Sequence, residues 1–338
     1  MPRTQRNALE VTCAIFPPSS CKNSPLSWEV IVLNVDRLYR SAVLGVAGVQ
    51  GIKNLVRTKG WGMASRFVAG ETLESAVNAV DQLERDGVHG ILDLLGEMVS
   101  SRAQSDEFVR QIMDIFPAVA QKPWQKYVSI KLSQLGLDIS PDLALENGRR
   151  ILSAARDIGS FVRVDMEDSP RVDATLEVFR ALRGEFDNVG LVLQSMLRRT
   201  EADLESLSDL KPNLRIVKGA YLEPADAAFP EKSTVDLMYR RLVYMNLEKG
   251  NHTAIATHDD AIIRDVKLFV ERRGIPKSQF EFQLLYGIRR DLQKQLAGEG
   301  YTVRAYIPYG KDWYAYFSRR IAERPGNALF VLRGMLKG

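Results

Sequence analysis

The sequence predicts a (β/α)8 barrel, a TIM-like α/β fold, with extra helices before the first strand and a final helix across the barrel mouth. Eight apolar, β-rich runs recur between Gly90 and Gly310, and helical patterns separate them. Strands that alternate with helices indicate βαβ units and a parallel sheet. The chain has 338 residues, enough for one barrel of roughly 250 residues.

The eight strand candidates combine β-branched and aliphatic residues and end in polar or turn-forming ones. They are Gly90–Gly96, Tyr127–Gly136, Phe161–Asp168, Val189–Met196, Leu214–Tyr221, Thr253–Asp259, Phe280–Gly287 and Thr302–Gly310. In the last run, Val303, Ala305 and Ile307 alternate with Arg304 and Tyr306, as in a strand with two different faces.

Helical periodicity fills the intervening segments. The predicted helices are Thr72–Arg85, Pro141–Ile158, Pro170–Leu182, Glu201–Leu210, Ser233–Lys249, Asp260–Arg272, Arg289–Ala297 and Asp312–Glu323. Pro141 stands at the first position of its helix, where proline is favoured. Pro325 and Gly326 stop the last one.

A doubly wound sheet is the competing fold, and it would need a glycine-rich phosphate turn after its first strand. The glycines between Gly45 and Gly51 have the wrong spacing for GxGxxG and no strand–turn–helix context. The doubly wound alternative is therefore set aside.

The chain before the barrel divides into an irregular extension, residues 1–27, and a helical region, residues 28–88; the catalytic barrel is residues 89–338. Trp28–Gln50 is the most apolar segment, but Asp36, Arg37 and Arg40 interrupt it, so it is too short and too charged to span a bilayer. It fits an amphipathic helix that packs on the body or rests on a membrane surface.

Composition excludes several classes of protein. The formal net charge is only +4, and the absence of a long Lys/Arg run argues against nucleic acid as a partner. The two cysteines, Cys13 and Cys21, imply no disulfide framework, and three histidines make a histidine-rich metal site unexpected. We expect no metal and a cytoplasmic location, with peripheral contact at the inner face of the cell membrane as the open question.

Polar side chains gather where the predicted strands end. In a barrel these ends form the working face. The candidates are Lys131, Asp165, Met166, Gln194, Arg215, Lys218, Tyr221, Thr257, His258, Tyr286, Arg289 and Tyr306. So many polar groups on one rim would be costly to desolvate without a polar ligand.

The helix after the last strand adds two guanidinium groups. Tyr316, Arg319, Arg320 and Glu323 are three and four residues apart, so they share one helix face. A planar, permanently charged fork suits a carboxylate or phosphate. Glu323 lies one turn beyond Arg319 and would hold it, although a solvated basic face with a helical ion pair has the same spacing.

The same segments resemble successive motifs of the flavin-dependent proline dehydrogenases. The motifs, in order, are SIKLSQLG, VRVDMEDS, LVLQSM, LRIVKGAY, ATHD, EFQLLYG, RAYIPYG and AYFSRRIAERPGN. Each is modest alone, but the ordered set, from about Ile91 to Leu336, is specific. The chain ends at Gly338 without an aldehyde dehydrogenase domain, so it resembles the single-function form.

The resemblance implies FAD-dependent oxidation of L-proline to pyrroline-5-carboxylate, with electrons passed to a quinone. It implies that Arg319 and Arg320 bind the proline carboxylate and that Lys131 pairs with Asp165 near the substrate. The remaining implied substrate contacts are Leu285, Tyr306 and Tyr316. The implied flavin contacts are Met166, Gln194, Arg215, Lys218, Gly219, Ala220, Thr257 and His258.

Chemistry gives these roles a physical basis. Hydride transfer requires the substrate carbon to be held against the flavin, which is a positioning task. Cationic Arg215 and Lys218 would stabilise a reduced, anionic flavin. On this basis we expect Asp165 and Arg215 to be the catalytic residues, while the group that accepts the imino proton stays open.

Other interpretations remain at this point. Lys131 and Asp165 are equally compatible with a structural ion pair, His258 with a helix cap, and Gly219–Ala220 with a tight strand exit. A Schiff-base lyase or aldolase on the same barrel would use Lys131 or Lys218 as its nucleophile. A metabolite-binding or scaffold protein would keep the barrel without turnover.

Overall fold

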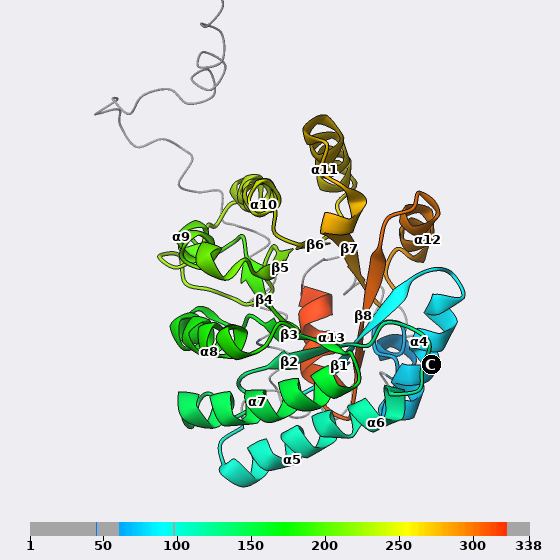
Figure 1. Ribbon diagram of the computed structural model, residues 1–338, viewed down its shortest axis with the longest axis vertical. Coiled ribbons are helices and arrows are strands. Elements are labelled where there is room, and N and C mark those ends of the chain that lie inside the picture. The colour runs from blue at the N-terminus through cyan, green and yellow to red at the C-terminus, as the bar shows by residue number, and fades with distance from the viewer. Residues whose placement is uncertain (1–44, 46–60, 97–98, 323–338) are drawn as a thin grey trace, which may run out of the picture. The chain divides into compact units, whose positions relative to one another are not determined.

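Eight parallel strands close into a single barrel (Figure 1). The computed structural model describes Gly45, residues 61–96 and residues 99–322. The strands are β1 (His89–Leu94), β2 (Tyr127–Lys131), β3 (Phe161–Asp165), β4 (Val189–Gln194), β5 (Asn213–Val217), β6 (Thr253–Ala256), β7 (Phe280–Leu285) and β8 (Val303–Tyr309). Each strand pairs with the next in sequence, and β8 pairs with β1, so the predicted barrel is confirmed.

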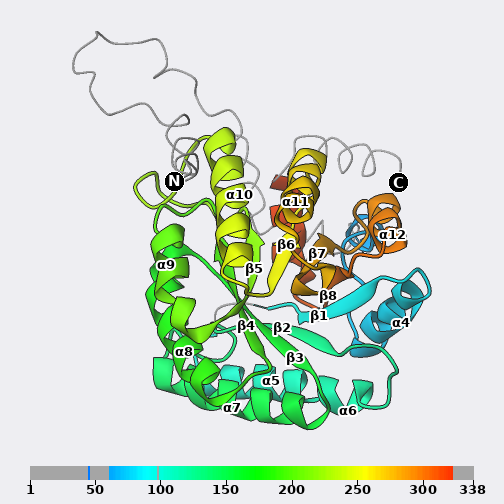
Figure 2. The same cartoon turned by 45° about the horizontal axis from the view of Figure 1, so that its top comes forward.

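Helices surround the strands (Figure 2). They are α3 (Trp61–Ala64), α4 (Leu73–Glu84), α5 (Arg102–Met113), α6 (Ile115–Val119), α7 (Pro141–Asp157), α8 (Val172–Glu185), α9 (Thr200–Ser206), α10 (Lys232–Glu248), α11 (Asp260–Arg273), α12 (Arg290–Gly298) and α13 (Trp313–Ala322). Short 3-10 turns are η2 (Ser169–Arg171), η3 (Ser208–Leu210) and η4 (Lys277–Gln279).

The predicted element boundaries differ from the observed ones in a regular way. Every strand ends earlier than its apolar run suggests, because the last residues of each run turn out of the sheet as loop. The sequence prediction missed α5 and α6, while α3 lies in the predicted helical region 28–88 without having been predicted as a separate helix. The extension 1–27 and, except for Gly45, residues 28–60 of the predicted helical region lie outside the described residues, so the three-part domain division remains a prediction.

Side chains cap the starts of two helices, and the predicted position of Pro141 is confirmed. Ser140 caps α7 by accepting a hydrogen bond from the amide of Asp142, and Pro141 is at the first helical turn. Thr72 and Ser75 form a capping box at the start of α4. These caps satisfy amides that an α-helix leaves without partners.

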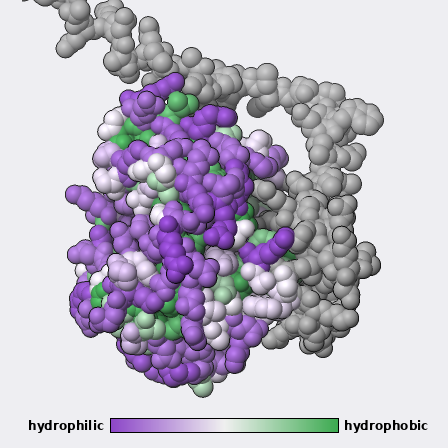
Figure 3. Space-filling view, turned by 90° about the vertical axis from the view of Figure 1, so that its right-hand side faces the viewer, coloured by the Kyte–Doolittle hydropathy of each residue, from purple (hydrophilic) through white to green (hydrophobic). Residues whose placement is uncertain are grey.

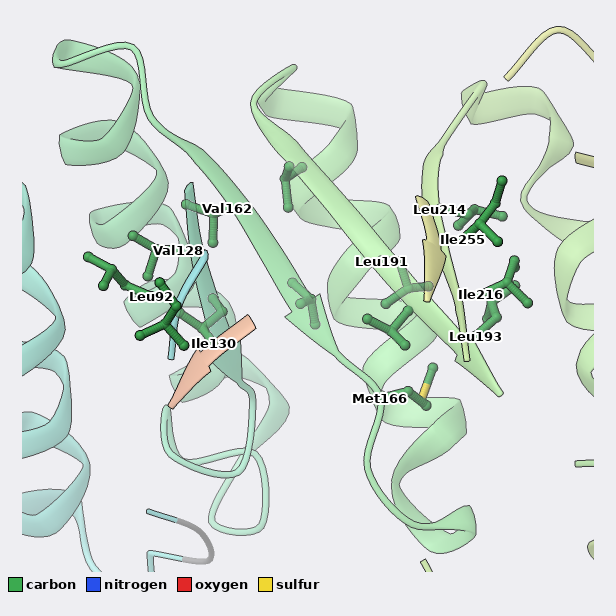
Figure 4. Close-up of a cluster of buried hydrophobic side chains, with 14 of the residues drawn as sticks. Leu92, Val128, Ile130, Val162, Met166, Leu191, Leu193, Leu214, Ile216 and Ile255 are labelled. Carbon is green, nitrogen blue, oxygen red and sulfur yellow. The ribbon is translucent and has the colours of Figure 1, made fainter. Parts of the chain in front are cut away.

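The outer face of the barrel carries the apolar core. Figure 4 shows aliphatic side chains of neighbouring strands, including Val128, Leu191 and Ile216, in the layer between the sheet and the helices. All three are at most 1 % exposed. Because apolar residues alternate with polar ones along each strand, the apolar set faces the helices and the polar set faces the barrel axis.

The barrel interior is unusually polar as a result. Buried there are Asp93, Lys131, Arg163, Asp165, Arg215, Glu281, Gln283 and Arg304, none more than 8 % exposed. Buried charges of this kind need partners. The partners divide into two groups, one at each end of the barrel.

Helix α13 closes the end of the barrel where the strands finish. In Figure 1 it lies over the middle of the strand ring. Trp313 and Phe317 pack in a second apolar cluster with Leu95, Ala64 and Val68. This cluster fixes the first turns of α13 against the segment that follows β1.

Candidate active site

A buried ionic cluster centred on Asp165 lies at the carboxyl ends of the strands. The Asp165 carboxylate accepts hydrogen bonds from Ser129 Oγ at 2.6 Å, from Tyr306 OH at 2.7 Å and from Arg215 Nη2. Lys131 Nζ lies 3.6 Å from the same carboxylate. Side chains of β2, β3, β5 and β8 therefore converge on one acidic group.

The charges around Asp165 decide its protonation. Burial by itself would raise the pKa of Asp165, but the Arg215 and Lys131 charges outweigh burial and hold the pKa below its usual value. The same carboxylate raises the pKa of Arg215 against the effect of burial. Asp165 is therefore an ionised group whose lone pairs are already engaged, which suits a positioning role.

Asp93, on β1, is a member of the cluster that the sequence prediction missed. Its carboxylate accepts a hydrogen bond of 2.8 Å from Lys131 Nζ, a shorter contact than the one Lys131 makes with Asp165. Burial raises the pKa of Asp93, and the Asp165 charge adds to this, against the opposing charge of Lys131. One signal was present: an aspartate inside the apolar run Ile91–Leu95.

A hydrogen-bonded column continues from the cluster down the barrel. Arg215 Nη1 donates to Gln283 Oε1 at 3.3 Å, and Gln283 Nε2 donates to Glu281 Oε1 at 2.5 Å. Glu281 in turn accepts from Arg304 Nε at 2.8 Å. The orientation of Arg215 at the active end thus depends on groups nearer the opposite end.

The rim over β3 and β4 contains two predicted cofactor contacts. Met166 is buried directly after β3, and Gln194 is the last residue of β4. Gln194 Nε2 donates to the carbonyl of Glu167 at 2.7 Å, and Thr200 Oγ1 donates to the Gln194 carbonyl at 2.6 Å. The Gln194 side chain is therefore held in place beside Met166.

Beyond β5 the backbone makes a turn that only glycine fits. Gly219 has φ +118°, and a Cβ atom there would lie 2.3 Å from Met196 Sδ. Lys218 lies 2.6 Å from Asp236 and 3.1 Å from Asp259. Unlike Arg215, whose acidic partner lies in the barrel, Lys218 pairs with carboxylates of α10 and the start of α11.

Two further candidates, Thr257 and His258, lie directly after β6. Asp259 caps α11 by accepting from the amides of Ala261 and Ile262, while Thr257 Oγ1 accepts from the Asp259 amide. The His258 ring reaches toward β7. Its Nε2 accepts a 3.0 Å hydrogen bond from the amide of Leu285, the last residue of β7.

Helix α13 brings the two arginines to the same end of the molecule. The Arg320 guanidinium lies 5.0 Å from the ring centroid of Tyr316. Arg319 lies 5.9 Å from the ring of Tyr221, in the segment after β5. Since α13 follows β8, this contact crosses the barrel mouth. The predicted Arg319–Glu323 pair falls outside the described residues.

The predicted residues thus separate into neighbouring groups on one face. Lys131, Asp165, Arg215 and Tyr306 touch directly; Met166, Gln194, Lys218, Gly219, Ala220, Thr257, His258 and Leu285 follow the ends of β3 to β7; Tyr316, Arg319 and Arg320 lie on α13. The sequence prediction missed Asp93, Ser129 and the column residues Gln283 and Glu281.

A (β/α)8 barrel with a buried polar rim at the carboxyl ends of its strands defines the class: barrel enzymes that work at this face. The sequence model of the family described as proline dehydrogenase matches residues 76–333. A proline dehydrogenase of Deinococcus radiodurans is 57% identical over 309 residues, which are 90% of this chain and 100% of that protein. The chain belongs to the proline dehydrogenase family.

Other relatives agree. Proline dehydrogenase 1 of Bacillus subtilis is 48% identical over 274 residues, 81% of this chain and 91% of that protein. A crystal structure of proline utilization A from Bdellovibrio bacteriovorus matches with a TM-score of 0.73 and 23% identity, over 85% of this chain and 36% of that one. The chain thus spans about a third of that protein, and the likeness supports the fold.

The face in Figure 3 is mainly hydrophilic, with small separate hydrophobic spots. Within residues 61–96 and 99–322, no helix has the length and apolar character needed to cross a membrane.

Proposed function

We propose that this protein oxidises L-proline to pyrroline-5-carboxylate, with FAD as the hydride acceptor and a quinone as the final electron acceptor. The observation that carries the proposal is α13, which holds Arg319 and Arg320 over the barrel end that contains the Asp165 cluster. Membership of the proline dehydrogenase family supports the same reaction.

Substrate recognition would begin with the carboxylate. Arg319 and Arg320 are half-buried on α13, so their guanidinium groups are partly desolvated but remain accessible to a ligand. Bidentate pairing of guanidinium and carboxylate fixes position as well as energy. We assign the proline carboxylate to these two side chains.

The ring of the substrate would contact the apolar and aromatic surfaces beside the clamp. Tyr316 lies on the same helix, Leu285 ends β7, and Tyr306 on β8 is fixed by its hydrogen bond to Asp165. Burial and the Asp165 charge raise the pKa of Tyr306 well above its usual value, so the phenol stays neutral and donates. We assign these three residues to the substrate ring.

FAD fits the residues that follow β3 to β6. Gly219 lets the backbone after β5 pass close to Met196, because an added Cβ atom would lie 2.3 Å from the Met196 sulfur. Arg215 Nε is buried and has no hydrogen-bond acceptor among the described residues, so it remains available to a ligand. FAD, when bound, accepts the hydride from the proline ring.

Around that cofactor the side chains would position and exclude water. Met166, Gln194, Thr257 and His258 would line it, with Lys218 and Ala220 at the β5 exit. Arg215, held by Asp165, would place a fixed positive charge near the cofactor, which would favour a reduced, anionic form. Asp165 holds Arg215, Tyr306 and Lys131 in one arrangement, and the acceptor of the imino proton stays unassigned.

The test is an absorption spectrum of the purified protein before and after anaerobic addition of L-proline. We expect a flavin band near ~450 nm that bleaches with proline. A flavin band that does not bleach would keep the cofactor and reject the substrate. Absence of flavin, with none taken up from added FAD, would reject the proposal.

A Schiff-base lyase is the second enzymatic candidate, and the ion pairs count against it. Lys131 lies between Asp93 and Asp165, and Lys218 between Asp236 and Asp259. A nucleophilic lysine must be a neutral amine. Borohydride trapping of substrate on either lysine would revive this candidate.

A peripheral membrane contact through Trp28–Gln50, which lies outside the described residues, is testable by liposome flotation of full-length and truncated chains.

A further inference from the structure

A second pocket opens at the opposite end of the barrel from the candidate active site. It has a volume of about 380 Å³, and its lining includes Trp124, Tyr127, Asn213, His252, Glu281 and Arg304. Tyr127 and Asn213 are the first residues of β2 and β5, and Glu281 and Arg304 are the second residues of β7 and β8. The pocket therefore lies at the amino ends of the strands.

The polar groups of this pocket are incompletely satisfied. Arg304, only 6 % exposed, donates through Nε to Glu281 and through Nη2 to Gln125, but its Nη1 is buried and has no acceptor within the described residues. His252 Nδ1 is buried and lacks a partner there as well. Buried polar atoms without partners are costly, and because both residues line the pocket, a ligand there would supply the missing partners.

The charge balance favours an anion. Arg163 is fully buried beneath the pocket and bonds only to neutral groups among the described residues: the hydroxyl of Tyr127 and oxygen atoms of Leu191 and Asn213. Glu281 is the partner of Arg304. Two buried guanidinium groups thus face one carboxylate, which leaves a net positive charge at this end.

The aromatic residues that line the pocket indicate that the bound anion has an apolar part. Trp124 and Tyr127 are largely buried aromatic residues, and Phe161 joins them in the lining. The Arg304 guanidinium lies 4.8 Å from the Tyr127 ring centroid, and Tyr127 and Phe161 are 4.9 Å apart between centroids. A volume of this size suits a small organic molecule rather than a single ion.

We propose that this pocket binds a small organic carboxylate, its charge on Arg304 and His252 and its carbon part against the aromatic walls. The site is separate from the proline site and does not depend on the proposed oxidation. Its ligand contacts the lower end of the column Arg304–Glu281–Gln283–Arg215.

The test uses benzoate as the probe and benzamide as its uncharged counterpart of the same shape. The protein is the full-length Arg319→Ala/Arg320→Ala variant, so that carboxylate binding at α13 is removed. The readout is the NMR signal of His252, assigned by its loss in His252→Leu, at constant ionic strength. We expect saturable shifts with benzoate and no comparable shifts with benzamide.

Two variants examine the binding groups. Glu281→Gln/Arg304→Gln removes the cation without leaving a buried carboxylate unpaired, and it should weaken benzoate binding by roughly tenfold or more. His252→Phe fills the pocket and should abolish the binding heat in calorimetry even if the double variant does not fold. Unmoved His252 signals, equal shifts with benzamide, or undiminished binding in a folded variant would overturn the proposal.

Discussion

Among single residues, Asp165 links the largest number of groups in the site. Its carboxylate receives Ser129, Tyr306 and Arg215, and Lys131 is nearby. Because the surrounding charges keep it ionised, its role is to hold donors in position. The same arrangement fits a structural ion pair and the positioning role proposed above, which is why the sequence alone does not separate the two.

Replacing Asp165 tests that role. We expect Asp165→Ala to retain FAD and to lose turnover by more than about tenfold, because Arg215 and Tyr306 lose their common acceptor. Flavin absorbance measures occupancy, and anaerobic reduction by proline measures turnover. Asp187→Ala, at a fully exposed carboxylate, is the control. Turnover at the unmodified level would make Asp165 structural only.

His252 predicts a pH dependence of stability. Burial lowers the pKa of His252, the Arg163 and Arg304 charges lower it further, and Glu281 opposes them. The folded chain therefore binds fewer protons than the unfolded chain just below the unfolded pKa of roughly 6.5. His252 therefore contributes to the free energy of unfolding above a pH of roughly 6.5, and this contribution is lost as the pH falls below that value.

Urea unfolding in carboxylate-free buffers between about pH 5 and pH 7.5 measures the effect. The free energy of unfolding should fall with decreasing pH less steeply in His252→Leu than in the unmodified protein. Identical slopes for the two proteins would show that His252 contributes nothing to the pH dependence.

At the scale of elements, α13 and the loop after β5 make the site specific. Helix α13 depends on Trp313, which donates a 3.0 Å hydrogen bond to Glu71 and packs with Phe317. Arg319 and Arg320 therefore lie on a helix whose first residue, Trp313, is held by these contacts. This arrangement suits a clamp that must hold a small substrate in one orientation.

Replacing Arg319 or Arg320 should weaken proline binding more than it lowers kcat. Arg319→Ala and Arg320→Ala are each expected to raise KM for proline by about tenfold or more, with a smaller change in kcat, because they remove carboxylate pairing. Arg290→Ala, at an exposed position on α12, provides the control. If steady-state kinetics give an unchanged KM, the carboxylate is bound elsewhere.

The loop after β5 is tested by Gly219→Ala. The added Cβ would collide with Met196 and force the residue from a conformation that only glycine adopts readily. We expect lower FAD occupancy, measured as the ratio of flavin to protein absorbance. Gly184→Ala in α8, where nothing lies within 4 Å of the new atom, should leave occupancy unchanged.

The sequence predicted the secondary-structure elements more completely than it predicted the contacts between them. Alternation in β8 correctly separated Arg304 and Tyr306 from the outward residues, because one chain segment contains that information. Asp93 was missed because its partner Lys131 is on another strand, and α5 because its buried face has only two apolar residues, Val109 and Ile112. Glycine at 219 was noticed, but the need for it depends on Met196, a long-range neighbour.

At the scale of the whole molecule, the apolar side chains outside the barrel differ in role from the polar side chains inside it. Aliphatic residues such as Ile216 stabilise the barrel from outside, while the interior holds buried charged side chains at both ends. Ile216→Ala should therefore lower the free energy of unfolding by about 2–5 kcal/mol. Leu237→Ala, 61 % exposed, is the comparison and should change it by less than about 0.5 kcal/mol in urea unfolding.

The pairing of β1 with β8 has a consequence for the order in which the chain is made. On a ribosome, β1 emerges first among the strands and its second neighbour emerges last. Until Val303–Tyr309 is released, β1 and the most recent strand both present open edges with unpaired backbone groups. A nascent or prematurely terminated chain is therefore exposed to edge-to-edge association, and only the final strand removes that hazard.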